Sequence, residues 1–281
     1  MTDRPDSGGS ALRAILAADI VTHVPGVYDP VSAVLAVRAG HRAVLLSGAA
    51  ISTTMLGRPD LTFTPATQIA DRAAGLAPAL GSVPILADAD LGYDRPADAV
   101  WTALAYERSG IGGLLLDDDD HPGPAVLRIT ALASQVPQLA VVARVRGNGL
   151  AETMERCRAY AEAGADAVHP VGVDDPEHLG RIHAAFPGVP LVVTQPESAD
   201  RRLTDADLAA LGVRLVLHPL TAVLAALRAA SLAYRAIAEE GNADRVDRLP
   251  WPAYTALLEP NVPGAPAGSA SLLERIDDLD T

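Results

Sequence analysis

The residues best suited to chemistry are two carboxylates, Asp88 and Asp90, in the segment VPILADADLGY (83–93). Side chains two positions apart on a β-strand point to the same side. Two carboxylates placed in this way repel each other unless a positive charge lies between them. A single cysteine excludes a thiolate cluster, so a hard divalent cation is favoured, Mg²⁺ above all, although Mn²⁺ could replace it. The competing interpretation is that such acids cap helices or pair with arginine.

Other polar residues follow apolar runs in the same way. They are Gly26 and Asp29, Ser47 and Gly48, Asp117 to Asp120, Arg144 and Arg146, His169, Thr194 and Gln195, and His218. In a parallel barrel these strand ends meet, so at least three carboxylates would face an arginine. Arg144 can bind a substrate carboxylate or phosphonate bidentately, with a salt bridge to an acid as the alternative. His169 and His218 could transfer protons, but single histidines are more often structural.

The composition excludes several classes of protein. The net charge of −13 disfavours nucleic acid and anionic membranes as partners. All 22 basic residues are arginine, which excludes Schiff-base aldolases, pyridoxal enzymes and Walker-type phosphate loops, because each needs a lysine. The first residues lack a secretory signal pattern, and no apolar run of about 18 residues is evident. We therefore expect a cytoplasmic protein without a membrane span.

Short apolar runs alternate with helical patterns along the chain. The expected strands are residues 19–24, 42–47, 83–88, 112–117, 139–144, 166–171, 189–194 and 213–218. Most are too apolar for a half-exposed sheet, which indicates a parallel sheet covered on both faces. The regular spacing predicts an α/β fold, a TIM (β/α)8 barrel, rather than a doubly wound sheet. We expect an N-terminal extension at 1–18, the barrel at 19–241 and a C-terminal segment at 242–281.

Two segments depart from the regular repeat. Residues 49–65 form a long loop after the second strand and are a candidate lid. Residues 219–241 read as one long amphipathic helix, and WPAYTALLEPN (251–261) follows with nothing obvious to pack against in its own barrel. That apolar segment predicts a contact between subunits.

Several motifs resemble a known family. They are PGVYDPVSAVLAVRAGHRAVLLSGAAIS (25–52), LGRPD (56–60), VPILADADLGY, AVVARV (140–145) and HPLTAVLAALRAA (218–230). Through these motifs the chain resembles the isocitrate lyase/phosphoenolpyruvate mutase superfamily, and methylisocitrate lyase-like members most of all. The resemblance runs from about residue 25 to residue 240. It implies a TIM barrel with a C-terminal helix swapped between subunits, as a homodimer or homotetramer.

The resemblance also implies a role for individual residues. The family binds a 2-oxo acid on Mg²⁺ and stabilises its enolate. The implied metal residues are Asp88 in direct contact and Asp90 and Asp117 through water. The implied substrate residues are Tyr28, Ser47, Gly48, Ala49 and Arg144, and the implied catalytic residues are Arg144 and Asp60.

The loops around this site depart from the family pattern. The KxCGH-type loop after strand four is replaced by DDDDHPGPAVLRI (117–129), which has neither lysine nor cysteine. Arg146 stands where the family continues with an acid, and Val171 stands where many members have Glu or His. His121 is the nearest substitute for the missing proton donor.

These observations predict a Mg²⁺-dependent lyase that acts on a small 2-oxo or 2-hydroxy carboxylate through an enolate. Decarboxylation is the reaction that depends least on the missing KxCGH-type loop, because departing CO₂ needs no general base. Phosphonopyruvate-type P–C chemistry is the first alternative, although it lacks a lysine for the phosphoryl charge. A barrel that binds a ligand without turnover is the second alternative.

Overall fold

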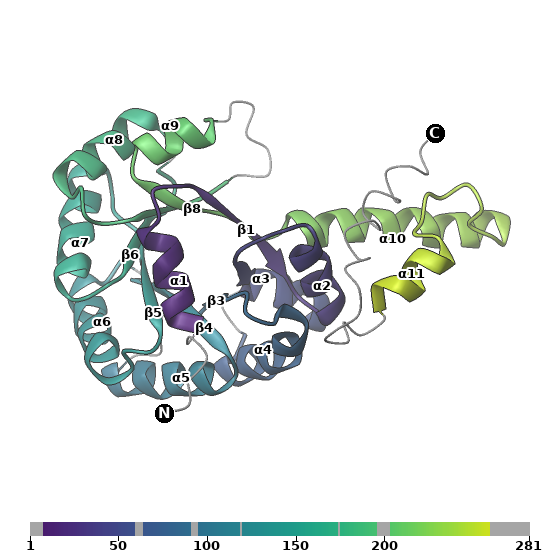
Figure 1. Ribbon diagram of the computed structural model, residues 1–281, viewed down its shortest axis with the longest axis horizontal. Coiled ribbons are helices and arrows are strands. Elements are labelled where there is room, and N and C mark those ends of the chain that lie inside the picture. The colour runs from purple at the N-terminus through teal and green to yellow at the C-terminus, as the bar shows by residue number, and fades with distance from the viewer. Residues whose placement is uncertain are drawn as a thin grey trace.

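The computed structural model describes residues 8–59, 64–90, 95–118, 120–173, 175–195 and 203–258. Its strands form a closed parallel barrel in chain order, β1 to β8, with helices around it (Figure 1). The TIM barrel expected from the sequence is confirmed. The candidate catalytic residue Asp60 lies outside the described residues.

The strands lie close to the positions expected from the apolar runs. They are β1 (Thr22–Val27), β2 (Val44–Leu46), β3 (Ile85–Asp88), β4 (Ile111–Asp117), β5 (Ala140–Val145), β6 (Ala167–Pro170), β7 (Leu191–Thr194) and β8 (Val213–His218). The first prediction, 19–24, was wrong by three residues at each end. Barrel closure explains the shift, because Thr22 pairs with Leu215 of β8 and Val27 with Leu46 of β2. Ile20 is 51% exposed instead.

The outer helices cover the barrel, and the strands separate two hydrophobic cores. The outer helices are α2 (Pro30–Arg38), α3 (Gly48–Ile51), the π-helix η1 (Ser52–Leu56), α4 (Ala66–Leu80), α5 (Pro96–Arg108), α6 (Pro122–Gln135), α7 (Leu150–Glu162), α8 (Pro176–Ala185) and α9 (Asp205–Ala210). One core lies between strands and helices and includes Leu114 and Val141. The other fills the barrel and includes Leu86, Leu115 and Val142. Alternate strand residues thus face opposite cores.

A short helix, α1 (Gly8–Ala17), closes the N-terminal end of the barrel. Its Leu12 side chain is fully buried in the interior core. Gly9 makes this approach possible, since a Cβ there would lie 1.9 Å from the carbonyl oxygen of Gln138. Because α1 fills one end, the open end of the barrel is the one at the C-terminal ends of the strands.

The last two helices form an arm that projects from the barrel (Figure 1). In α10 (Thr221–Glu240) only Val223 is buried. By length and composition alone α10 could cross a membrane, although Arg228 and Arg235 interrupt its apolar residues, and the expectation of a protein without a membrane span stays a prediction. The second helix, α11 (Trp251–Leu258), is tied to α2, because the Arg38 guanidinium donates to the Leu257 carbonyl at 3.1 Å.

Candidate active site

Asp88 is the central acid of the barrel mouth. It ends β3 and is 6% exposed. Its Oδ2 accepts from the backbone N–H of Gly48 at 2.7 Å, and its Oδ1 accepts from Nη2 of Arg144 at 2.8 Å. Leu86, two residues earlier, belongs to the interior core, so Asp88 faces the inside of the barrel. The structure therefore joins three residues expected at the site, which come from the start of α3 and from strands β3 and β5.

Asp117 lies on the neighbouring strand and faces the same space. Nη1 of Arg144 is 3.9 Å from its Oδ2. The Arg146 guanidinium lies closer to the Asp117 carboxylate. Its Nε is 2.9 Å from both carboxylate oxygens, and its Nη2 is 2.7 Å from Oδ2. Arg144 and Arg146 are thus positive charges beside the two acids. Arg146 was noted in the sequence as a departure from the family pattern, but its pairing with Asp117 was not predicted.

Asp118 has a structural role that the sequence did not reveal. It is 1% exposed, and its Oδ2 accepts from the Tyr160 hydroxyl at 2.7 Å and from Nη1 of Arg156 at 3.0 Å. Burial, followed by the hydrogen bond to Asp118, raises the pKa of Tyr160. Asp118 also accepts from the backbone N–H of Arg146 at 3.1 Å. The network anchors the start of the acidic loop to α7. The sequence signal for this network was the four-residue spacing of Arg156 and Tyr160, which places both side chains on one face of a helix.

The remaining metal candidate, Asp90, joins the site through its backbone. Its carbonyl accepts from the Asp117 N–H at 2.6 Å, and its φ of +40° places it in the left-handed region. Ser47 is 2% exposed at the N-cap of α3, followed by buried Gly48 and half-buried Ala49. Of these three residues Gly48 contacts Asp88, and the pocket role that the family resemblance implied for them stays a prediction.

Two further candidates lie at helix starts. Tyr28 is half-buried just before α2, where burial and then Asp29 raise its pKa. His121 is the solvent-exposed N-cap residue of α6, and its backbone N–H donates to the Asp118 carbonyl at 2.8 Å. Neither residue contacts the Asp88–Arg144 pair in the hydrogen bonds and ion pairs of the described chain.

The two histidines at strand ends have different surroundings. His218 is close to His23, with its Nε2 2.9 Å from Nδ1 of His23, and the other nitrogen of His23 lies 3.0 Å from Asp205. His169 is instead 4% exposed and lies beside Arg144 in the strand register. Burial, then the positive charge of Arg144, lowers its pKa to about 3. His169 is therefore a neutral imidazole near the acids.

The carboxylates of the mouth are the residues that could hold a magnesium ion. Across the described residues, no group of three or more Asp, Glu, His or Cys side chains could hold a metal. The implied metal set of Asp88, Asp90 and Asp117 stays a prediction, and within it Asp88 and Asp117 share the Arg144 guanidinium. Mg²⁺ commonly takes one or two carboxylates and keeps several waters, so this oxygen pair fits a hydrated Mg²⁺.

The chain is similar to a known protein family and to named enzymes. A family model described as phosphoenolpyruvate phosphomutase matches residues 12–238. An oxaloacetate decarboxylase of Ectopseudomonas mendocina is 32% identical over 257 residues, which cover 85% of this chain and 86% of that protein. A protein of Corynebacterium glutamicum named probable 2-methylisocitrate lyase 2 is 30% identical over 266 residues, with 87% and 86% covered.

A solved structure of oxaloacetate acetylhydrolase, in complex with its product oxalate, is also similar. It superimposes with a TM-score of 0.82 at 25% identity and covers 99% of both chains. The family match spans most of the barrel, and the relatives are carbon–carbon lyases. The chain therefore belongs to the phosphoenolpyruvate phosphomutase family.

Proposed function

We propose that the chain is a lyase that cleaves or decarboxylates a small 2-oxo or 2-hydroxy carboxylate through an enolate. The observation that carries the proposal is the Arg144 guanidinium, which Asp88 holds at 2.8 Å while its side chain stays 18% exposed. A guanidinium at an open barrel mouth can bind a carboxylate bidentately. The names of the relatives, an oxaloacetate decarboxylase and a methylisocitrate lyase, support this class of substrate.

The roles of the residues follow from charge and position. Arg144 binds the substrate carboxylate, and Asp88 fixes the orientation of Arg144. When bound, Mg²⁺ or Mn²⁺ would be held by Asp88 and Asp117, and it would polarise the 2-oxo group and stabilise enolate charge. Decarboxylation is the favoured reaction, because it needs no base at the shortened loop. The pyruvate enolate that remains after CO₂ leaves must take up a proton at its methylene carbon, and His121 and Asp60 are the proposed donors.

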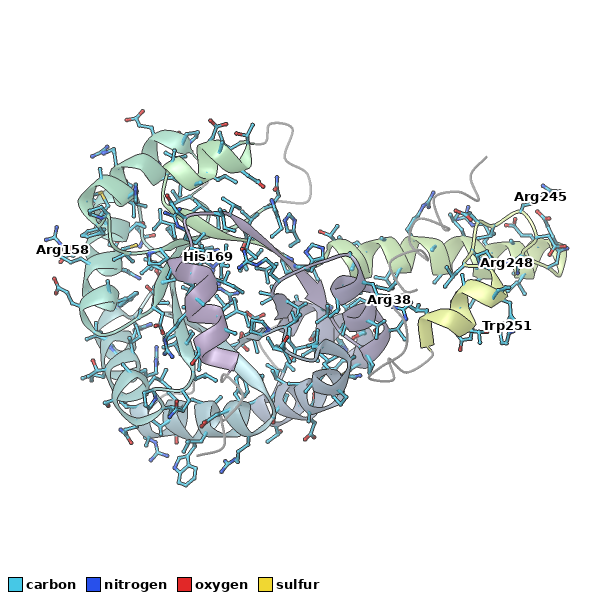
Figure 2. The ribbon with its side chains drawn as sticks, in the orientation of Figure 1. Arg38, Arg158, His169, Arg245, Arg248 and Trp251 are labelled. Atoms are coloured by element: carbon cyan, nitrogen blue, oxygen red, sulfur yellow. The ribbon has the colours of Figure 1, made fainter. Side chains whose placement is uncertain are left out.

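Substrate turnover tests this proposal. We expect wild-type protein with Mg²⁺ to convert oxaloacetate to pyruvate, measured with a coupled dehydrogenase. Arg144→Lys keeps the charge beside Asp88 but loses the planar guanidinium, which can bind a carboxylate through two parallel hydrogen bonds. The value of kcat/KM should therefore fall by about 100-fold. Arg158→Lys, at an exposed position on α7 (Figure 2), is the matched control and should be unchanged.

Other outcomes would redirect the assignment. Turnover of phosphonopyruvate but not of oxaloacetate would favour P–C chemistry, the reaction in the family model's own description. Oxalate binding without turnover of any tested acid would favour the ligand-binding barrel. Equal activity of wild type and Arg144→Lys would contradict the role of Arg144.

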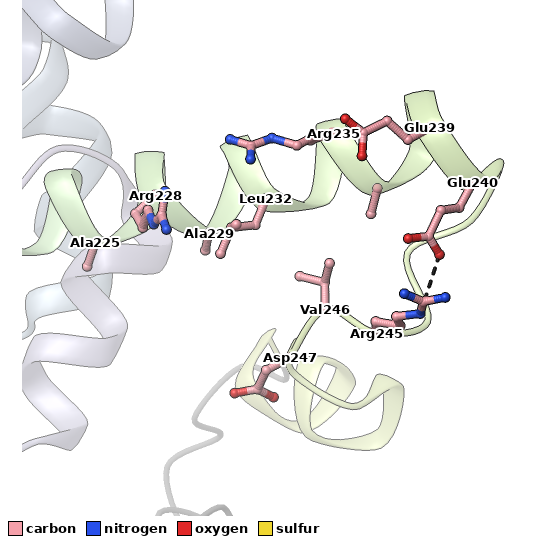
Figure 3. A pocket seen from close by; sticks show the side chains of 11 residues that line it. Ala225, Arg228, Ala229, Leu232, Arg235, Glu239, Glu240, Arg245, Val246 and Asp247 are labelled. Carbon is pink, nitrogen blue, oxygen red and sulfur yellow. Dashed lines mark ion pairs between the residues drawn. The ribbon is translucent and has the colours of Figure 1, made fainter.

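We also propose that the arm contacts a second copy of the chain, in a homodimer or homotetramer that exchanges these helices. Several large apolar side chains of α10 are open to solvent, including Leu227 at 48%, Tyr234 at 73% and Ile237 at 51%. Between α10 and residues 245–247 lies a groove of about 590 Å³ (Figure 3). Arg245 and Glu240 close one end of this groove at 3.5 Å.

Oligomeric mass tests this contact. Light scattering after gel filtration should give at least twice the mass of one chain. Leu227→Glu and Ile237→Glu, which place charges on the exposed face of α10, should shift the protein towards the monomer. A wild-type monomer would contradict the proposal. A cytoplasmic location, without membrane or nucleic-acid partners, stays a prediction.

A further inference from the structure

His169 faces the interior of the barrel at the level of the candidate site. Its strand neighbour in the register is Arg144, whose own neighbour on the other side is Asp117. Ala167, two residues before His169, packs in the interior core. Because alternate strand residues share a face, the imidazole points inward, as do Arg144 and Asp117. Figure 2 shows His169 among the strands, far from the arm.

One nitrogen of this buried ring is unpaired. Nε2 of His169 lies 3.1 Å from the Thr194 hydroxyl. Nδ1 has no hydrogen-bond partner within the described part of the chain, although the residue is only 4% exposed. Buried polar atoms in native proteins nearly always have a partner. Arg144 and Thr194, on the strands to either side, both reach solvent at the mouth, so a ligand bound there can supply the partner.

The surrounding charges keep this ring neutral. Burial and Arg144 lower its pKa to about 3, with Asp117 opposing and Arg146 adding to the effect. A neutral imidazole offers one donor and one acceptor nitrogen. When the Thr194 hydroxyl donates to Nε2, Nδ1 carries the hydrogen. An uncharged N–H donor is thereby held beside the guanidinium of Arg144.

We propose that Nδ1–H of His169 donates a hydrogen bond to a second oxygen-bearing group of the substrate, while Arg144 binds its first carboxylate. The preferred substrate is then an oxo acid with a second carboxylate or hydroxyl, such as oxaloacetate, over a simple monocarboxylate such as pyruvate. This inference rests on the proposed lyase function and adds its substrate class. An apolar replacement would leave the second group without a partner in the bound state.

Three substitutions at one position separate the hydrogen bond from packing. His169→Phe removes both nitrogens, His169→Asn places an N–H near the Nδ1 position, and His169→Gln reproduces Nε2 instead. We expect His169→Phe and His169→Gln to raise the KM for oxaloacetate about tenfold, and His169→Asn to stay within about threefold of wild type. Oxalate, which mimics the pyruvate enolate and lacks the distal group, should bind all four proteins within about twofold.

Each result decides the inference. An unchanged KM in His169→Phe, with oxalate still bound, would reduce His169 to a packing residue that pairs with buried water. If His169→Phe does not fold, equal KM values for the Asn and Gln variants would overturn the inference in the same way. Failure of wild type to bind oxalate would instead overturn the proposed lyase function, and the substrate class with it.

Discussion

The guanidinium of Arg146 occupies both oxygens of the Asp117 carboxylate, with Nε at 2.9 Å from each. Asp117 is also the acid on β4 that would help to hold a metal ion. When the proposed metal binds, Asp117 would have two rival positive partners, the Arg146 guanidinium and the divalent cation. The family pattern has an acid at position 146, which would add to the attraction for a cation, whereas the arginine opposes it.

This rivalry predicts that Arg146→Gln binds metal more tightly than wild type. Removing the guanidinium frees Asp117 and lowers the positive charge of the mouth, so the Kd for Mg²⁺ should fall about tenfold or more. Titration calorimetry with Mg²⁺, repeated with Mn²⁺, measures the change. Arg158→Gln controls for net charge. Equal affinity in wild type and Arg146→Gln would show that Arg146 does not compete with the metal.

The neutral state of His169 predicts a loss of stability in mild acid. Its pKa is about 6.5 in the unfolded chain and about 3 in the folded protein, so between these pH values the unfolded state binds the extra proton. This stability contribution is complete above pH 6.5 and declines as the pH falls towards 3. From pH 7 to pH 5 the loss from His169 should be roughly 2 kcal/mol.

Urea unfolding at pH 7 and pH 5 checks that expectation in wild type and His169→Phe. The other titrating groups change the unfolding free energy of both proteins with pH in the same way. Their contribution therefore cancels when the two proteins are compared. The variant should lose less stability on acidification than wild type does. Parallel changes in the two proteins would mean that the folded protein protonates His169 readily, contrary to its burial beside Arg144.

The fit of α1 into the barrel predicts a large effect of one methyl group. Gly9→Ala places a Cβ against the Gln138 carbonyl oxygen, so the helix must move, at a cost of about 1–3 kcal/mol in unfolding free energy. Gly75→Ala is the matched control. Nothing lies within 4 Å of its Cβ position on the exposed side of α4, so alanine should stabilise by about 0.5–1 kcal/mol.

Denaturant unfolding of both alanine variants supplies the test. The sign of the effect should differ between the two positions. A Gly9→Ala protein as stable as wild type would show that α1 does not need this close contact with the loop before β5.

The sequence was sufficient for the strands and for the set of residues at their ends. Eight apolar runs with helical patterns between them define a parallel barrel, and its geometry brings Asp88, Asp117 and Arg144 to one mouth. That inference needs only the period of the side chains and the direction of the strands. It does not need knowledge of individual contacts.

The partners of the charged groups could not be read in the same way. Whether Arg146 pairs with Asp117 or Asp118 depends on the register of β4 against β5 and on side-chain directions. The closure of the N-terminal end of the barrel by α1 depends on the fit of Gly9 against Gln138, two residues far apart in the chain. The contact of Arg38 with Leu257 likewise joins segments that local patterns do not connect.

The most direct test of the site is the binding of oxalate in the presence of Mg²⁺, measured by calorimetry. Wild type, Asp88→Asn and Arg144→Lys would be compared, with circular dichroism to confirm that each is folded. We expect one oxalate per chain in wild type and affinity at least about tenfold lower in both variants, because each loses part of the Asp88–Arg144 pair. No binding by wild type, or equal binding by all three proteins, would contradict an oxo-acid site at this barrel mouth.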